Sequence, residues 1–553
     1  MNFINQIKRI PLFYPAALVL LLTVTLYYTN CSYDQFYNLF NSDALQIPSI
    51  YKDVFIDHNG IRGWCLSTSP FFFPDMFFYF LFYFIFGSFV KATLLYGLFQ
   101  LFFISFLFHR IMKEINPSLL ISTTAISSVL LTLFFFCNIY LHYDEYSFLL
   151  VISNYHVGTF NLALLSTLIL MKLRKENKTS FLIFLLLCLF LGEISDRLFL
   201  VMFYIPAIIT STLFFLLERK VKQYRLKFIK LFLVFAFALI AGEYMHSFIE
   251  NSGIVRYPPS TLTNFDYLKQ KLIGPEISAF FLNTSRAYME ILLEGTVRTL
   301  LIFLITVSFL LSIIVFFKCI RQYKSSKKVD ILFYYNTFSI AWFVIALIAP
   351  FSHWHLVPEG EWLRYYFSAY ILALLNLPVW IFYSFRAYFS EKKMYYISSV
   401  VLLLLFILVS KKLYKEGIDK MIARSNFYPT DVMELDNLAE KNGLKYGVAD
   451  FWKSKPITMF SKKRLRVYAV YSDLCPYDIL ANYNWFYKSI EDKQKAPIFN
   501  FVIVTTLPDT THVNKLFPNP LLKFNNQQLN LWKVPEFYYT MGSCALLLKD
   551  KKE

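Results

Sequence analysis

Residues 71–86 read FFFPDMFFYFLFYFIF, an apolar run that is interrupted by one proline and one aspartate and is dominated by aromatic rings. The run approaches the roughly 20 residues that a membrane-spanning helix needs. Its place near the start of the chain makes it decisive, because a full crossing here would reverse the side on which every later loop lies. The rest of the sequence must therefore settle whether this segment spans a bilayer.

The composition indicates a multi-pass membrane protein. Mean hydropathy is +0.48, and 57% of the 553 residues are hydrophobic, with aromatic residues at 20%. The core of a soluble domain stops growing beyond about 250–300 residues, so a soluble chain would not need this much apolar surface. We therefore expect a lipid bilayer around the chain. The first run, at 11–29, has no small-residue cleavage motif and is predicted to be a retained helix.

The positive charge is distributed as expected for a membrane protein. The formal net charge is +17, and much of it lies in short loops between apolar runs, which is typical of cytoplasmic loops and argues against a nucleic-acid partner. The clearest basic loops are KLRKENK (172–178), ERKVKQYRLKFIK (218–230), KCIRQYKSSKK (318–328) and FRAYFSEKK (385–393). Placing them in the cytoplasm predicts a chain in the cytoplasmic membrane with a cytoplasmic N-terminus.

The positions of these loops predict which apolar runs span the membrane, and they indicate that one run does not. We expect about 11 spanning helices, at 11–29, 90–108, 119–137, 149–171, 180–192, 198–217, 229–247, 299–317, 331–349, 365–384 and 395–410. Only residues 71–86 do not fit. We predict that they form a helix in the outer interface, with aromatic rings at the depth of the headgroups. The alternative is an ordinary span beside a miscounted neighbour.

The chain divides into two predicted domains. Residues 1–410 form an α-helical polytopic membrane domain, with outer loops at 30–89 and 248–298. Residues 411–553 are predicted to form an extracytoplasmic α/β domain, because FNFVIVTTLP (499–508) has the pattern of a buried strand. The stretch DFWKSKPITMFSKKRLRVYAVY (450–471) interleaves basic and aromatic side chains. Trp452, Lys453 and Lys455 are therefore candidates for contact with an acceptor, although the domain could equally be a lid on the bundle.

The cysteines give no metal motif. Neither CxxC nor HExxH is present, so a zinc site has no support. Cys31, Cys65, Cys475 and Cys544 fall on the predicted outer side, where disulfides are able to form, but their spacing does not show which of them meet.

Ionisable residues recur on the predicted outer side. Each costs about 2.5–3.5 kcal/mol at membrane depth, so such groups usually face a bundle interior or an aqueous cavity. In GEISDRLFL (192–200), Glu193 interrupts an apolar run together with two of the pocket candidates. These candidates are Asp43, Asp75, Asp144, Glu145, His156, Asp196, Arg197, His353, His355, Glu361 and Arg364. We expect a polar pocket that opens outward beneath the loops.

Some of these residues could instead have purely structural roles. Asp196 and Arg197 could form a neutralised pair that joins two spans. His353 and His355 flank Trp354 and could be interfacial anchors. Asp53 and Asp57 are expected to be solvated loop residues.

One reaction uses this combination of groups. When a hydroxyl attacks the anomeric carbon of a lipid-phosphate sugar, a carboxylate must take the hydroxyl proton, which typically contributes about 10²–10⁴-fold. Cations must also hold the departing phosphate, whose charge grows in the transition state. An acid of the first loop could serve as the base, and Arg197 and Arg364 as the cations.

The order of these parts resembles the GT-C membrane glycosyltransferases, especially the branch of the protein O-mannosyltransferases and the lipid A aminoarabinose transferase. The matching stretches are SDAL (42–45), SPFFFPDMFFYFLFYFIFG (69–87), FVKATLLYGLFQLFFISFLFHR (89–110) and, more weakly, EWLRYYFSAYILALL (361–375). The resemblance implies that residues 71–86 form an interface helix. It covers mainly the first 110 residues.

The resemblance also implies residue roles. Asp43 takes the place of the base that activates the acceptor, and Arg364 that of a late arginine near the donor phosphate. The usual Asp-Glu pair is here Ser42-Asp43, which leaves Asp34 and Asp57 open as counterparts. Relatives differ in whether they use a divalent metal, so this cofactor stays open.

The expected function is transfer of a sugar from a polyprenyl-phosphate carrier to a glycan, lipid or protein acceptor outside the cytoplasmic membrane. One alternative is a transporter or flippase of a lipid-linked glycan, although no internal repeat supports it. Another is a non-catalytic membrane protein whose outer domain binds a partner.

Overall fold

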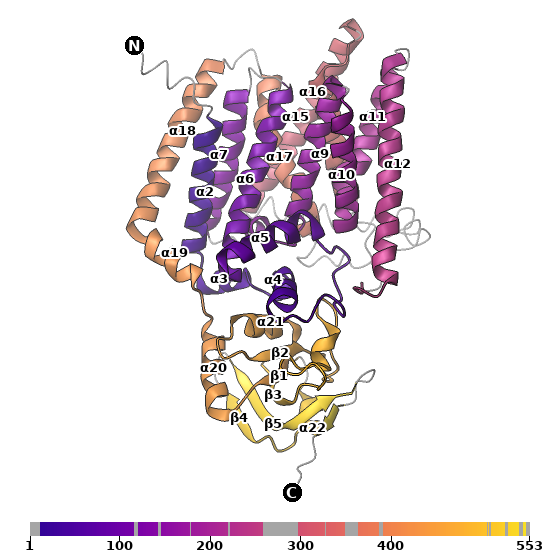
Figure 1. The fold of residues 1–553 in the computed structure, drawn as a ribbon. Coiled ribbons are helices and arrows are strands. Elements are labelled where there is room, and N and C mark those ends of the chain that lie inside the picture. The colour runs from indigo at the N-terminus through magenta and orange to yellow at the C-terminus, as the bar shows by residue number, and fades with distance from the viewer. Residues whose placement is uncertain are drawn as a thin grey trace, which may run out of the picture.

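The computed structural model describes residues 12–548 with internal gaps. The residues outside the description within this range are 116–119, 142–144, 177, 219–221, 258–296, 327, 349–362, 386–390, 506, 508–509, 526–528 and 541–545. The described chain forms a helical bundle with a sheet domain at one end of it (Figure 1).

The bundle consists of long, mostly apolar helices. They are α2 (Phe13–Asn30), α6 (Phe89–Ile115), α7 (Leu120–Leu141), α8 (Glu145–Val151), α9 (Val157–Lys175), α10 (Thr179–Ser195), η3 (Leu200–Tyr204), α11 (Ile205–Glu218), α12 (Lys222–Asn251), α15 (Val297–Ser326), α16 (Ile331–Ile348), α17 (Leu363–Ser384) and α18 (Glu391–Lys412). Among the described residues, nine helices are long and apolar enough to cross a membrane. This is consistent with a multi-pass membrane protein.

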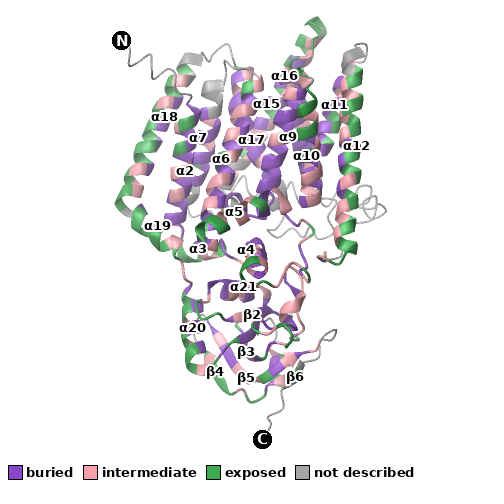
Figure 2. Ribbon diagram, viewed as in Figure 1, coloured by how far each residue is buried: buried purple, intermediate pink, exposed green. Residues whose placement is uncertain are grey.

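The outer sides of the bundle expose apolar side chains. Figure 2 shows exposed and half-buried residues along α12 and α18, at opposite edges of the bundle. Phe237 of α12 and Leu403 of α18 are 62% and 58% exposed. Water would not favour such surfaces, whereas the hydrocarbon of a bilayer solvates them.

Every predicted span overlaps a helix, but one prediction is wrong in detail. The expected continuous span at 149–171 is broken: α8 ends at Val151 and α9 begins at Val157. In between, Asn154 and His156 adopt left-handed backbone conformations, with φ of 64° and 65°, which end a right-handed helix. Apolar periodicity alone did not reveal this turn.

The decisive segment 71–86 forms η2 (Phe72–Met76) and α5 (Phe77–Phe86). At 1.5 Å per residue, the ten residues of α5 extend about 15 Å, half of a typical hydrocarbon core of about 30 Å. Its exposed side carries Phe77, Leu81 and Phe84, while Tyr79 and Tyr83 are buried. An interface position therefore fits the length and the one-sided exposure of α5.

The first loop lies between the bundle and the sheet domain (Figure 1). It contains α3 (Tyr33–Asn38), α4 (Gln46–Tyr51) and η1 (Lys52–Ile56) before it reaches η2. Its last part also contacts the segment after α12, because the backbone N–H of Leu66 donates to Arg256 O at 2.8 Å and Arg256 N–H donates to Trp64 O at 2.8 Å. Most of the predicted second outer loop, 248–298, lies outside the described residues.

The sheet domain has a mixed sheet. Its strands are β1 (Tyr446–Ala449), β2 (Arg466–Ala469), β3 (Phe499–Ile503), β4 (Leu522–Asn525), β5 (Asn530–Tyr539) and β6 (Leu546–Leu548). The order is β2-β1-β3-β5-β4, with β6 beside β5; β1 runs parallel to β2 and β3, and the pairs that involve β5 are antiparallel. The helices of the domain are α20 (Thr430–Asn442), α21 (Phe451–Phe460), the 3-10 turn η6 (Tyr483–Phe486) and α22 (Thr511–Leu516).

The helical part continues past the predicted boundary at residue 410. From α18 the chain runs through η5 (Leu413–Gly417) and α19 (Ile418–Ser425) before α20 opens the α/β fold. The predicted strand at 499–508 is present as β3. Val448 of β1 and Val502 of β3 are fully buried register partners, which explains the apolar pattern of that stretch.

The carboxylate of Asp53 ties the first loop to the sheet domain. Its Oδ2 accepts hydrogen bonds from Trp64 Nε1 at 2.8 Å and Asn482 Nδ2 at 2.7 Å, and its Oδ1 from Asn59 Nδ2 at 2.7 Å and Trp485 Nε1 at 2.9 Å. The side chain is 2% exposed. Burial raises the pKa of Asp53, and the four N–H donors oppose that rise because they favour the charged form.

Asp57 makes a second tie to the same domain. Its two oxygens accept from the guanidinium of Arg466 at 2.8 Å each, and Lys52 Nζ lies 2.8 Å from Oδ2. The expectation that Asp53 and Asp57 are solvated loop residues is therefore wrong. Asp53 is buried and the Asp57 side chain is only 9% exposed, and both accept hydrogen bonds from the sheet domain.

Lys455 of α21 lies buried on the first loop. Its Nζ donates to Ser42 O at 2.9 Å and lies 4.8 Å from the centre of the Phe451 ring. The side chain is buried, so desolvation lowers the pKa of Lys455 to about 7, while the charge of Asp43 opposes this fall. In the folded protein, Lys455 is therefore only partly protonated at neutral pH.

The cysteines on this side behave differently from one another. Cys475 is disulfide-bonded, while Cys31 and Cys65 are buried thiols that form no disulfide. Cys544 lies outside the described residues.

Replacing Asp53 by Ala should release the sheet domain from the first loop. The change removes the acceptor of two buried N–H donors, on Trp64 and Asn482, and of two half-buried ones, and each buried group left unsatisfied costs about 1–3 kcal/mol. We expect the free energy of unfolding to fall by about 3 kcal/mol or more, together with faster amide hydrogen exchange at residues 480–486. Asp34→Ala, at an exposed acid of the same loop, is the control. Wild-type exchange in Asp53→Ala would contradict this role.

Lys455 should make stability depend on pH. A lysine in the unfolded chain keeps its proton to about pH 10, so between pH 7 and 10 the unfolded state binds more protons than the docked one. Stability should therefore rise with pH in this window, by up to about 1.4 kcal/mol per pH unit. Denaturant unfolding at several pH values measures this slope. Lys455→Met should flatten it, and an equal slope in both proteins would refute the assignment.

Candidate functional site

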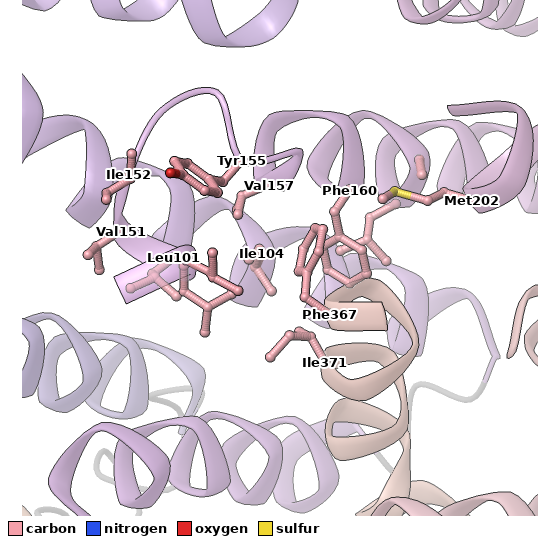
Figure 3. Packing of buried hydrophobic residues seen from close by; sticks show 14 of the residues in the cluster. Leu101, Ile104, Val151, Ile152, Tyr155, Val157, Phe160, Met202, Phe367 and Ile371 are labelled. Carbon is pink, nitrogen blue, oxygen red and sulfur yellow. The ribbon is translucent and has the colours of Figure 1, made fainter. Parts of the chain in front are cut away.

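The break between α8 and α9 places two polar side chains inside the bundle. Asn154 and His156, both buried, lie on the turn, and Asn154 Nδ2 donates to Asp43 O at 2.6 Å. Apolar packing holds the turn in place from both ends. Figure 3 shows these buried side chains, which come from α8, the turn itself, α6, α9 and α17: Val151, Ile152, Tyr155, Val157, Phe160, Leu101, Ile104 and Phe367.

His156 is paired with Asp196. Its Nδ1 lies 2.6 Å from Asp196 Oδ2, which also accepts from Thr159 Oγ1 at 2.5 Å. Asp196 is the residue that ends α10, and it is 1% exposed. Burial alone would raise the pKa of Asp196, but the charge of His156 and the hydrogen bonds outweigh it and hold that pKa below its usual value.

The other oxygen of Asp196 holds the segment that leads into η2. Asp196 Oδ1 accepts from Ser69 Oγ at 2.9 Å. Next to it, Ser195 O and Ser195 Oγ accept the backbone N–H groups of Phe71 and Phe73, at 2.9 Å each. Phe71 has φ of 59°. Non-glycine residues in this left-handed conformation often cluster at functional sites. Three of them, Phe71, Asn154 and His156, occur in this cluster.

Asp75 lies behind this segment and is 1% exposed. Its Oδ1 accepts from Tyr96 Oη at 2.9 Å, whereas Oδ2 has no hydrogen-bond partner among the described residues. A Cβ on Gly158 would lie 2.1 Å from Oδ2, so only glycine fits at that position of α9. Asp196 and His156 are close enough to act on the charge of Asp75.

Asp43 adjoins this polar cluster through its main-chain carbonyl. Its side chain is half-buried, unlike those of Asp75 and Asp196. Asn154 holds its backbone from the bundle side, and Lys455 of the sheet domain holds the neighbouring Ser42 O. The first loop, the α8–α9 turn and the sheet domain therefore meet at Asp43.

Glu193 is an acid that sequence reasoning noticed but did not place in the pocket. It is 3% exposed, and neither carboxylate oxygen has a hydrogen-bond partner in the part of the chain that the structure describes. A Cβ on Gly242 of α12 would lie 2.5 Å from its Cγ, so α10 and α12 pack closely around it. A buried, unpartnered carboxylate is costly, which makes Glu193 a functional candidate.

Arg197 does not pair with Asp196. Its guanidinium lies 3.6 Å from Glu243 Oε2, with 39% of the side chain exposed. The alternative of a neutralised Asp196–Arg197 pair is therefore wrong, because Asp196 binds His156 on one side and Arg197 faces α12 on the other. The guanidinium of Arg197 remains partly exposed to solvent and lies close enough to Glu193 to act on its charge.

The three tail candidates lie on α21. Trp452 is 54% exposed. Lys453 Nζ pairs with Asp431 at 2.7 Å, and Lys455 is buried against the first loop. Only Trp452 presents most of its side chain to solvent.

Several predicted site residues cannot be placed. Asp144, His353, His355 and Glu361 lie outside the described residues. Glu145 and Arg364 belong to the first turns of α8 and α17, and the description does not extend to their side chains.

The arrangement supplies acids of two kinds. Within the described residues, no group of three or more His, Cys, Asp or Glu side chains is placed to hold a metal ion. The buried Asp196–His156 pair can orient its neighbours, and the half-buried Asp43 can exchange a proton with a molecule that arrives from outside. Arg197 can meet an anion.

Comparison with known proteins adds no assignment. No protein-family model matches the chain, and no curated protein matches it.

Proposed function

We propose that this chain is a membrane glycosyltransferase that takes a sugar from a lipid-phosphate donor and transfers it to an acceptor outside the cytoplasm. The observation that carries the proposal is the convergence at Asp43. Here the main-chain carbonyl of half-buried Asp43 accepts a hydrogen bond from Asn154, on the turn that also carries His156, the partner of buried Asp196. These residues come from separate segments of the sequence and are held by a strained turn, which folding a helical bundle does not require.

In the proposed reaction, Asp43 is the general base. The acceptor hydroxyl oxygen forms a bond to the anomeric carbon of the sugar while the bond from that carbon to the phosphate oxygen breaks. The hydroxyl proton passes to the Asp43 carboxylate, and the bonding electrons leave with the lipid phosphate. Half-buried Asp43 is better placed to meet an acceptor than Asp196, which is buried and already accepts hydrogen bonds from three side chains.

The other groups have proposed roles around this centre. The departing phosphate gains charge, and Arg197 and Arg364 are the cations proposed to stabilise it. Asp196 and His156 position the η2 segment and the α8–α9 turn. The exposed apolar face of α5, with Phe77 and Phe84, would let a lipid donor approach sideways from the bilayer.

The proposal includes a topology. The basic loops lie in the cytoplasm, α7 and α10 cross with the nine longer helices, and α5 lies in the outer interface. The sheet domain is then extracytoplasmic, and the acceptor, a surface glycan, lipid A or a protein, reaches Asp43 from that side.

Asp43→Asn tests the base directly. The substitution keeps the size of the side chain and removes its basicity, so we expect kcat for sugar transfer in isolated membranes to fall about 10²–10⁴-fold. Asp34→Asn is the matched control, since Asp34 is an exposed acid of the same loop and the alternative counterpart in the resemblance. Transfer near the wild-type rate in Asp43→Asn, or its loss in Asp34→Asn instead, would remove Asp43 from the mechanism.

Glu193 favours a second candidate function, a transporter of a lipid-linked glycan. Buried acids inside membrane domains often carry protons or bind cargo. In the enzyme, Glu193→Gln should leave transfer by the purified chain within about twofold and raise the thermal unfolding midpoint, because burying an amide costs less than burying a carboxylate. The contrary result is that the wild type moves the lipid-linked glycan across the membrane of reconstituted vesicles, that Glu193→Gln abolishes this transport, and that Glu243→Gln does not. The transporter would then be correct and the enzyme proposal wrong.

A further inference from the structure

A second polar site lies at the end of the bundle far from the sheet domain. It is a cavity between the last turns of α9 and α11, the first turns of α10 and α16, and the start of α12 (Figure 1). Its described lining includes no residue of the outer cluster. The basic loops predict that this end of the bundle faces the cytoplasm.

The charge of the cavity is positive. Arg174 donates to both oxygens of Glu218 through its Nη2, at 2.9 Å each, so the only acid of the described lining is already neutralised. Lys227 and Lys230 of α12 add two positive charges, and Lys227 Nζ donates to the neutral carbonyl of Arg174 at 3.4 Å. The described lining therefore carries a net charge of +2, from three cations and one acid.

The arginine is held rigidly. Its guanidinium carbon lies 5.2 Å from the centre of the Phe214 ring and 4.9 Å from that of Tyr334. Two aromatic contacts and a two-point ion pair leave the group little rotational freedom. The cationic edge of the cavity is thus pre-organised, whereas the two lysines can adjust to a ligand.

The rest of the cavity is apolar and continues onto the surface of the bundle. Phe215 and Phe228 stack with ring centres 4.4 Å apart and form one wall. On α12, Leu226, Ile229 and Leu233 are 53%, 50% and 61% exposed. A cationic edge therefore leads directly to an apolar surface that lipid chains would cover.

We propose that this cavity binds the phosphate headgroup of an anionic glycerophospholipid, with an acyl chain lying along α11 and α12. The headgroup phosphate meets Lys227 and Lys230, and the chain lies against Phe215, Phe228 and Leu233. A soluble anion would use the lysines but not the apolar wall, and a zwitterionic lipid would use the wall but would bring no net negative charge. Basic pockets between helices at a cytoplasmic membrane surface suit anionic lipids for this reason.

Lipid titration of the purified full chain tests the proposal. Dihexanoyl phosphatidylglycerol is added to protein in dodecyl maltoside, and the thermal unfolding midpoint is followed to obtain an apparent Kd. We expect the midpoint to rise with phosphatidylglycerol and not with dihexanoyl phosphatidylcholine or inorganic phosphate. An equal rise with phosphatidylcholine would show a non-specific detergent effect, and an equal rise with inorganic phosphate would show a soluble-anion site. Either result would overturn the proposal.

Variants locate the binding. Lys227→Gln with Lys230→Gln should weaken the apparent Kd about 30-fold, since each lysine near a lipid surface contributes about 1 kcal/mol. The matched control is Arg225→Gln with Lys324→Gln, which removes two exposed cations from the same end of the bundle but outside the cavity. An unchanged Kd in the first double variant, or an equal loss in the control, would refute the site.

A folding defect would not obscure the result. If the double variant does not fold, Lys230→Glu reverses one charge at an exposed position and should give the same loss of binding. Lys227→Arg with Lys230→Arg should retain binding. The outcome is independent of the proposed sugar transfer, because these residues lie far from Asp43 and lipid binding is measured without substrate.

Discussion

The buried carboxylate of Asp53 is the interaction on which the outer half of the molecule depends. This carboxylate is buried away from water and is compensated by hydrogen bonds from Trp64, Trp485 and two asparagines. Two of those donors belong to the first loop and two to the sheet domain, so neither part satisfies the charge alone. These shared hydrogen bonds fix the position of the sheet domain relative to the loop. The Asp57–Arg466 ion pair reinforces the same contact.

The held loop in turn positions the polar cluster. Its backbone carbonyls at Ser42 and Asp43 accept hydrogen bonds from Lys455 and Asn154. Further along, Ser69 donates to Asp196 at the end of α10, and the loop then enters η2, which carries Asp75. Most polar groups buried along this path are paired, as a low-dielectric interior requires. Among the buried carboxylates of the described residues, the exceptions are one oxygen of Asp75 and both oxygens of Glu193.

Much of the fold could be predicted because membrane helices leave a strong local signal. Apolar length and basic loops located the helices of the bundle, and the strand pattern located β3. The site was harder, because its contacts join distant positions: nothing local in SNYHVG (153–158) or GEISDR (192–197) indicates that His156 binds Asp196. The solvated interpretation of Asp53 failed because its partners Asn482 and Trp485 lie more than 400 residues later. The turn at Asn154 was missed because its apolar flanks imitate a continuous span, although an Asn–Tyr–His sequence inside an apolar run was a usable sign.

The central claim is that the sheet domain and the Asp43 cluster lie on the opposite side of the membrane from the basic loops. Single cysteines introduced at exposed Lys495 of the sheet domain and exposed Lys324 at the far end of α15 test it most directly, by labelling of intact cells with a membrane-impermeant maleimide. The account predicts that position 495 reacts in intact cells and position 324 only after the membrane is opened. Labelling of position 324 from outside, with position 495 protected, would contradict it.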